Sequence, residues 1–148
     1  GTKVLIGYSN SFTAEDKCKV VALQQIAAGS VVEFNVAGPC GFGTLNAAKQ
    51  KKVWGIGVDT DQSYLGPHIL TSVVKHVEIG IFDAIRDVQA GQKIGGADLV
   101  FNLKNGGVGL GKFSPKAKLK KAWLKQIATL KKQIISGKIK PPLTVGGA

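Results

Sequence analysis

Hydrophobic residues in the first 60 positions form short runs separated by amphipathic segments. Runs rich in β-branched residues, typical of buried strands, lie at residues 3–8, 31–36 and 53–58. Helical spacing of apolar residues predicts a helix between Thr13, as N-cap, and Gly29, and a second short helix over residues 44–51. This β-α-β-α-β order predicts parallel strands joined by right-handed crossovers, and therefore an α/β fold.

The pattern is less regular after Asp59, where a polar loop over residues 59–68 is expected. The further predicted elements are strands at 69–73 and 99–103, a helix at 77–90, a glycine-rich loop at 105–111, and a last helix from Ser114–Pro115 to Gly137. An extended tail over residues 138–148 completes the predicted order.

Composition excludes several classes of protein. With 44% hydrophobic and 20% charged residues, the 148-residue chain is not a disordered one, and no apolar run approaches the ~20 residues of a membrane span. Two cysteines exclude a disulfide scaffold and a four-cysteine zinc site, and leave a Cys18–Cys40 bridge open. Because Met is absent even at position 1, we expect a trimmed chain or a fragment of a longer one.

The net charge of +11 lies in the last third of the chain. Residues 1–100 carry equal numbers of basic and acidic side chains, whereas residues 101–148 carry lysines and no acid. The last predicted helix has an apolar stripe of Leu119, Trp123, Ile127, Leu130 and Ile134, and most lysines fall off it. A solvated helix face is the simplest interpretation, and an anionic membrane or wall polymer is the electrostatic alternative. Nucleic-acid binding is not expected, since Arg86 is the single Arg.

Two loops could carry chemistry at the carboxyl ends of the predicted strands. Gly38–Gly43 joins a strand to a helix, where open backbone N–H groups suit a polar ligand; a purely structural turn is the alternative. Its glycine order does not match a dinucleotide fingerprint or a P-loop. Asp59 and Asp61 follow the third strand, and suit sugar-hydroxyl recognition, a metal site or a turn cap.

The remaining reactive side chains favour no catalytic mechanism. Lys75 follows the fourth strand and, by composition alone, is a solvated surface lysine. His68 and His76 lack companion ligands at metal-binding spacing and are interpreted as loop residues. Cys40 has no base nearby in sequence, so it is not expected to be a nucleophile.

Several segments together resemble the basic membrane protein family, the purine-nucleoside receptor lipoproteins of ABC importers. The resemblance is carried by Val-Asp59-Thr-Asp61-Gln within residues 56–67, by Leu70–Lys75, and by the Gly-Gly-Val-Gly-Leu loop at 106–110. Residues 11–13, 36–43, 47–49 and 134–141 match in the same order, so that essentially the whole chain is covered.

The resemblance implies one parallel-sheet lobe of the two-lobed type I periplasmic-binding-protein fold. Family members are about twice as long, so the 148 residues would be mostly a C-terminal lobe, with the N-terminal lobe absent. Residues 74–100 would cross to, or pack on, that missing lobe. The apolar stripe of the helix at 77–90 would then be bare, and either dimerisation or a missing part of the chain would cover it.

The resemblance also implies a solute site between the lobes. Asp59 and Asp61 would accept ribose hydroxyls, Lys75 would donate to the sugar, and Phe42 would stack on the base, with the backbone of Gly41 and Gly43 shaping the pocket. Neither a cofactor nor a metal is implied. The partners would be a purine nucleoside or similar solute and a membrane permease, and the receptor would be anchored outside the cytoplasm through a lipid.

Two other classes remain as alternatives. One is a small α/β enzyme that processes nucleotides or sugars, using Asp59 and Asp61 with a metal. The other is an adhesin or regulator derived from the same fold, in which the lysine-rich third binds an anionic partner.

Overall fold

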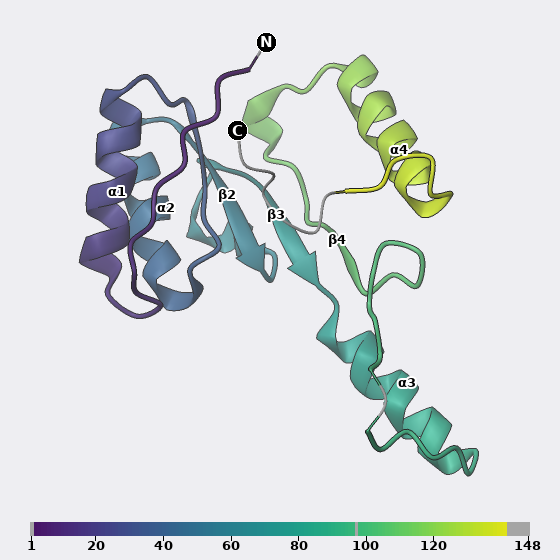
Figure 1. Ribbon diagram of the computed structural model, residues 1–148. Coiled ribbons are helices and arrows are strands. Elements are labelled where there is room, and N and C mark those ends of the chain that lie inside the picture. Colours follow the sequence, from purple (N-terminus) through teal and green to yellow (C-terminus); the bar gives the residue numbers. More distant parts are fainter. Residues whose placement is uncertain (1, 97, 142–148) are drawn as a thin grey trace. The chain divides into compact units, whose positions relative to one another are not determined.

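The structure is a computed structural model that describes residues 2–96 and 98–141 (Figure 1). It divides into two compact units, which are described separately. The first comprises the chain up to Lys75 together with Leu110–Ala117, and the second comprises His76–Gly109 and the chain from Lys118 onward.

A mostly parallel sheet forms the centre of the first unit. Its strands are β1 (Val32–Phe34), β2 (Trp54–Asp59), β3 (Ile69–Lys75) and β4 (Val108–Leu110), in that order, with the unit boundary falling inside β4. β1 pairs with β2, and β2 with β3, in parallel. The predicted α/β class with parallel crossovers is therefore confirmed.

Helices α1 (Glu15–Ala27) and α2 (Gly41–Lys51) pack against each other beside the sheet (Figure 1). The core contains Leu45 and Ala48 of α2 and Ile69 of β3. A Cβ atom added at Gly43 would collide with the carbonyl oxygen of Glu15, so the glycine permits the close approach of the two helices.

The predicted strand at residues 3–8 is wrong, because this segment has no regular secondary structure. Its residues are mostly exposed, and among the described residues no backbone hydrogen bond joins it to the edge strand β1. An apolar, β-branched run is only a strand when a neighbouring strand satisfies its backbone groups.

Two predicted helix starts also differ from the structure. α1 begins at Glu15 without a side-chain cap, and the hydroxyl of Ser11, rather than Thr13, accepts from the N–H of Ala14 at 2.9 Å. α2 begins at Gly41, three residues before the predicted start, because the short 3₁₀ turn η1 (Gly38–Cys40) leads directly into it.

The second unit contains α3 (Val77–Gln89) and α4 (Lys121–Ile135). α3 matches the prediction, and Gly91 after it adopts a positive φ of 75°. No strand forms at residues 99–103; the strand is β4, within the predicted glycine-rich loop. The predicted tail is described only up to residue 141, and residues 142–148 lie outside the described part.

The last helix begins later than predicted. Ser114 and Pro115 lead into a short 3₁₀ turn, η3 (Pro115–Ala117), and the positive φ of Lys118 (44°) separates this turn from α4. The hydroxyl of Ser114 donates to the carbonyl oxygen of Pro67 instead of capping a long helix. Leu119 of the predicted stripe therefore lies outside α4.

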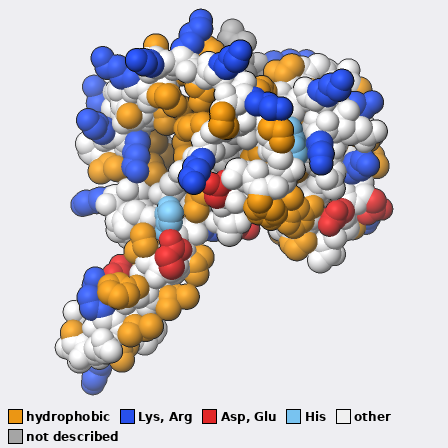
Figure 2. All heavy atoms as spheres, turned by 180° about the vertical axis from the view of Figure 1, so that it is seen from behind, with side chains coloured by type: hydrophobic (Ala, Val, Ile, Leu, Met, Phe, Trp, Pro, Cys, Tyr) orange, Lys and Arg blue, Asp and Glu red, His pale blue; other side chains and the backbone are white. Residues whose placement is uncertain are grey.

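Apolar side chains on α3 remain uncovered within the second unit. None of its residues is buried, and Ile81 and Ile85 are more than half exposed (57% and 54%). Figure 2 shows hydrophobic side chains gathered along this helix. Among the described helices, none combines the length and the apolar character needed to span a bilayer.

Candidate functional site

The carboxyl ends of β2 and β3 bring Asp59 and Lys75 together. In the parallel register, Asp59 is the partner of Val74, so Lys75 follows immediately alongside. Lys75 Nζ lies 2.7 Å from Asp59 Oδ1, and the two side chains remain 58% and 52% exposed. The ion pair is therefore preformed and accessible to a solute at the sheet edge where open α/β folds bind ligands.

Asp59 adopts an unusual backbone conformation at this position. Its φ is +71°, in the left-handed region that non-glycine residues seldom occupy and that Asp and Asn tolerate best. The chain reverses here, with the N–H of Thr60 donating to the carbonyl oxygen of Val58. The backbone thus turns away from the sheet and leaves the Asp59 carboxylate at the strand end.

Asp61 is held by backbone groups. Its Oδ1 accepts from the N–H of Ser63 at 3.0 Å, capping the turn η2 (Gln62–Leu65), and its Oδ2 accepts from the N–H of Lys112 at 3.3 Å. The Ser63 bond is the main cause that lowers the pKa of Asp61, with the Lys112 bond adding to it. These contacts support the interpretation of Asp61 as a turn cap, and a ligand-binding role for Asp61 stays a prediction.

The glycine-rich segment lies at the same edge of the sheet, because it follows the carboxyl end of the parallel strand β1. Phe42 is partly buried in the first turn of α2. A Cβ at Gly41 would collide with the side-chain amide of Asn35, and Gly43 faces α1, so both glycines have packing roles. Within the predicted set, the described hydrogen bonds and ion pairs join only Asp59 and Lys75.

Sequence reasoning missed three polar residues that shape this edge. Gln62 Oε1 accepts from the N–H of Val58, and the N–H of Gln62 donates to Ser72 Oγ, both at 3.0 Å. Asn35, which follows β1, is nearly buried, and its Nδ2 lies 3.5 Å from the carbonyl oxygen of Ile56. A signal was available for Asn35 and Ser72, because each is a polar residue within an apolar run that predicts a strand, whereas Gln62 lies outside such a run.

The other candidate groups do not assemble a reactive site. Cys18 and Cys40 form a disulfide that ties α1 to η1, so neither is a free thiol. His76 Nδ1 contacts Glu78 Oε1 at 2.8 Å, and burial is the main cause that lowers the pKa of His68. In residues 2–96 and 98–141, no group of three or more His, Cys, Asp and Glu is arranged to hold a metal ion.

Known protein sequences include relatives of this chain. Residues 2–144 match the profile of the family described as "ABC transporter substrate-binding protein PnrA-like". The chain is 36% identical to the ABC transporter nucleoside-binding protein BmpA of Lactococcus lactis, over 95% of this chain and 44% of that protein. It is 32% identical to basic membrane protein B of Borreliella afzelii, over 74% of this chain and 34% of that protein.

Solved structures share the fold. A solute-binding protein of an ABC transporter system from Aeropyrum pernix superimposes with a TM-score of 0.80 at 24% identity, over 97% of this chain and 50% of that chain. A protein described as a transcriptional activator of the comK gene from Bacillus halodurans gives 0.81 at 25% identity, over 91% and 47%. The chain thus spans half or less of the length of these proteins, and it belongs to the PnrA-like family of ABC transporter substrate-binding proteins.

Proposed function

We propose that these residues form part of an extracytoplasmic receptor that binds purine nucleosides, or a related sugar-containing solute, for an ABC importer. The observation that carries the proposal is the accessible Asp59–Lys75 ion pair at the carboxyl ends of two parallel strands. The name of the Lactococcus relative, a nucleoside-binding protein, supports the same ligand class.

The ion pair has the chemistry that a ribose requires. A carboxylate accepts hydrogen bonds from sugar hydroxyls, and an ammonium group donates to their oxygens. Lys75 Nζ already lies 2.7 Å from Asp59 Oδ1 in the absence of a ligand. Binding a sugar therefore costs little additional side-chain conformational entropy at these two residues. Their charges cancel, so the pair favours a neutral solute over a phosphate.

The base would be bound by Phe42 and by the backbone of Gly41 and Gly43. An aromatic ring that stacks on a nucleobase contributes about 1–3 kcal/mol, largely regardless of which base it meets. Discrimination between purines would then depend on backbone and side-chain polar groups at the carboxyl end of β1, where Asn35 lies.

The proposal includes a partner and a location. The receptor would deliver its solute to a membrane permease without catalysing a reaction, and would be anchored outside the cytoplasm through a lipid. The Cys18–Cys40 disulfide is compatible with such a location, because disulfides persist mainly in oxidising compartments.

Calorimetric titration of the complete gene product with inosine and guanosine tests the proposal. Asp59→Asn removes the charge while keeping a residue that tolerates positive φ, and Lys75→Met removes the donor. We expect each variant to bind about 10- to 100-fold more weakly, since hydrogen bonds to charged groups are worth about 1.5–3 kcal/mol.

Asp16→Asn provides a matched control, because it makes the same change of side chain at an exposed carboxylate in the first turn of α1. Its nucleoside affinity should equal that of the unmodified receptor. If Asp59→Asn and Lys75→Met both bind inosine and guanosine with unchanged affinity, the site assignment is wrong.

A further inference from the structure

β2 is longer than the edge strand beside it. β1 ends at Phe34, whose partner is Ile56, so residues 57–59 of β2 continue past the end of that neighbour. A backbone N–H group that is buried without a partner costs stability, and proteins satisfy nearly all such groups. The end of β2, whose last residue is Asp59, therefore needs other groups to complete its hydrogen bonds.

Alternation along β2 indicates which N–H faces the open side. The N–H of Trp54 donates to the carbonyl oxygen of Val31, directly before β1. The N–H of Gly55 donates in the other direction, to the carbonyl oxygen of His68, directly before β3. Because the two directions alternate along a strand, the N–H of Val58 is directed to the side where β1 has already ended.

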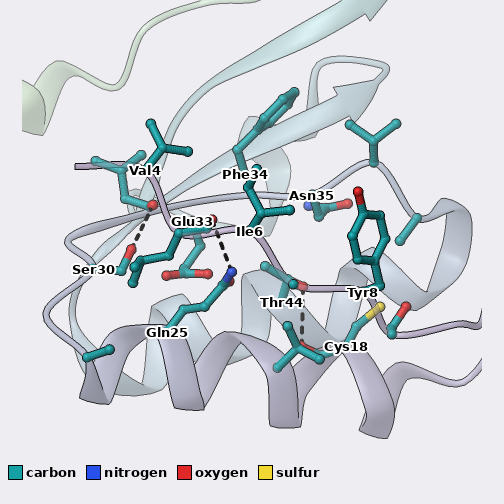
Figure 3. A pocket seen from close by; sticks show the side chains of 18 of the residues that line it. Val4, Ile6, Tyr8, Cys18, Gln25, Ser30, Glu33, Phe34, Asn35 and Thr44 are labelled. Carbon is teal, nitrogen blue, oxygen red and sulfur yellow. Dashed lines mark hydrogen bonds between the residues drawn. The ribbon is translucent and has the colours of Figure 1, made fainter. Parts of the chain in front are cut away.

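Two side-chain amides take the place of the missing backbone partners. The Oε1 atom of Gln62 accepts from the N–H of Val58 at 3.0 Å. The Nδ2 atom of Asn35, at the end of β1 (Figure 3), lies 3.5 Å from the carbonyl oxygen of Ile56. The Gln62 contact is the shorter of the two, and it holds the residue that directly precedes Asp59.

Gln62 is also tied to the next strand. Its backbone N–H donates at 3.0 Å to Oγ of Ser72 in β3, a residue that is completely buried. A Cβ atom added at Gly57 would collide with Oγ of Ser72 and with Oε1 of Gln62, so the glycine keeps free the space that these groups occupy. These two contacts, the Gln62 clamp, join β2 to β3 close to the carboxyl ends that carry Asp59 and Lys75.

The clamp encloses the turn at Asp59. This residue has a φ of +71°, and a non-glycine residue keeps such a conformation only where its surroundings fix it. Both backbone groups of Val58 are bonded within the turn, because its carbonyl oxygen accepts from the N–H of Thr60 and its N–H donates to Gln62. The Gln62 oxygen therefore completes the set of bonds that holds this turn.

We propose that Gln62 is a positioning residue for the solute site. By holding the backbone before Asp59 against β3, it fixes the carboxylate in the direction that meets Lys75 and a sugar hydroxyl. The inference rests on the proposed function of the Asp59–Lys75 pair. A site whose polar groups are held in place in advance loses less entropy on binding, so loosening the clamp weakens binding without removing a contact to the solute.

Calorimetric titration of the complete gene product with inosine tests the role of Gln62. Gln62→Leu leaves a side chain of similar size but removes the oxygen that holds Val58. We expect it to bind inosine at least about 10-fold more weakly, because the carboxylate is no longer preorganised. Gln50→Leu makes the same change at an exposed position of α2 and should bind with unchanged affinity. Unchanged affinity in Gln62→Leu would overturn the proposal.

A double-mutant cycle separates positioning from a general loss of structure. If Gln62 acts through the carboxylate of Asp59, adding Gln62→Leu to Asp59→Asn should weaken binding by less than about 2-fold beyond Asp59→Asn alone. A general structural effect would instead give the same loss of affinity in both backgrounds. That result would overturn the positioning role.

Hydrogen exchange without nucleoside tests the clamp separately from the proposed function. The Val58 amide should exchange at least about 10-fold faster in Gln62→Leu than in the unmodified protein, while the Gly55 amide stays unchanged. Equal exchange of the Val58 amide in both proteins would overturn the clamp. Failure of the unmodified receptor to bind inosine or guanosine would overturn the proposed function, and the exchange result would still decide whether the clamp exists.

Ser72→Ala provides a milder second variant. It removes only the acceptor of the Gln62 N–H and leaves the oxygen that holds Val58. We expect it to bind inosine about 3- to 10-fold more weakly, with a smaller effect in the Asp59→Asn background. An affinity equal to that of the unmodified receptor would contradict a clamp that reaches β3.

Discussion

Two carboxylates separated by one residue are held in different ways at the end of β2. Asp59 is paired with a lysine side chain and remains half exposed, whereas the oxygens of Asp61 accept from two backbone N–H groups. Removing Asp61 therefore leaves backbone donors of the protein without a partner. Removing the charge of Asp59 disrupts only an exposed ion pair, which contributes little to stability.

Asp61→Ala should lower the free energy of unfolding by about 1 kcal/mol, the usual cost of losing a side-chain cap. Asp59→Asn should change it by less than about 0.5 kcal/mol. Urea denaturation of both variants, beside the unmodified chain, measures the two values. A larger loss in Asp59→Asn than in Asp61→Ala would contradict the roles assigned to them.

The stability that the Asp61 cap contributes should also depend on pH. Because its hydrogen bonds lower the pKa of Asp61 below the ordinary value of 3.8, the ionised form binds more favourably in the folded state. The stabilisation is present above pH 3.8 and is lost as the pH falls through the lowered pKa of the folded state. The stability difference between Asp61→Ala and the unmodified chain should shrink accordingly in denaturation curves recorded from pH 6 down to pH 3.

For individual residues, the sequence indicated which side chains lie at the strand ends better than it indicated which groups they contact. The sequence predicted that Asp59 and Asp61 follow a strand, because the apolar run at residues 53–58 ends directly before them. The contact from the N–H of Lys112 to Asp61 joins residues 51 positions apart, and only the folded chain brings them together.

The helices and strands were predictable where local sequence decides them. α3 follows from apolar spacing, and the parallel pairing of β1 with β2 follows from the helix α2 that lies between these strands in the chain. The segment at residues 3–8 has the composition of a strand, but no strand within the described part of the chain pairs with it, and the sequence pattern alone does not show whether a neighbouring strand is present. For the same reason, the sequence predicted the apolar stripe of α3 but did not show what packs against it.

We expect the isolated 148-residue chain to self-associate through the stripe of α3. Buried apolar surface contributes about 25 cal/mol per Å², so two such stripes can stabilise each other. Ile81→Glu should raise the dissociation constant at least about 10-fold in sedimentation equilibrium, while Gln92→Glu, with the same added charge beyond the helix, should not. A monomeric unmodified chain would show that the stripe does not mediate this contact.

Charge is distributed unevenly over the whole molecule. The lysine-rich residues 101–148 contain no acid, whereas the first hundred residues, which include the ion pair, are balanced. Figure 2 shows lysine and arginine side chains spread over much of the visible surface. The proposed recognition of a neutral solute and an attraction to anionic partners would therefore belong to different parts of the sequence.

Nucleoside affinity should accordingly be almost independent of salt, changing less than about 2-fold between 50 and 500 mM, because salt screens long-range interactions between exposed charges. Attachment of the lysine-rich third to anionic lipid vesicles should fall at least about 10-fold over the same range. Parallel titrations with inosine and with vesicles measure both. A steep salt dependence of inosine binding would indicate that the lysines, rather than the Asp59–Lys75 pair, hold the solute.

The close approach at Gly43 has a mechanical consequence for the first unit. The backbone of α2 closely approaches that of α1 there, and the Cys18–Cys40 disulfide ties α1 to the turn η1 that leads into α2. The glycine-rich segment therefore has little freedom to shift without α1. We expect a spin label on the exposed Lys17 to show the same local mobility with and without bound solute, because α1 would move together with the glycine-rich segment as a rigid body. A change in the mobility of this label on solute binding would contradict the rigid coupling.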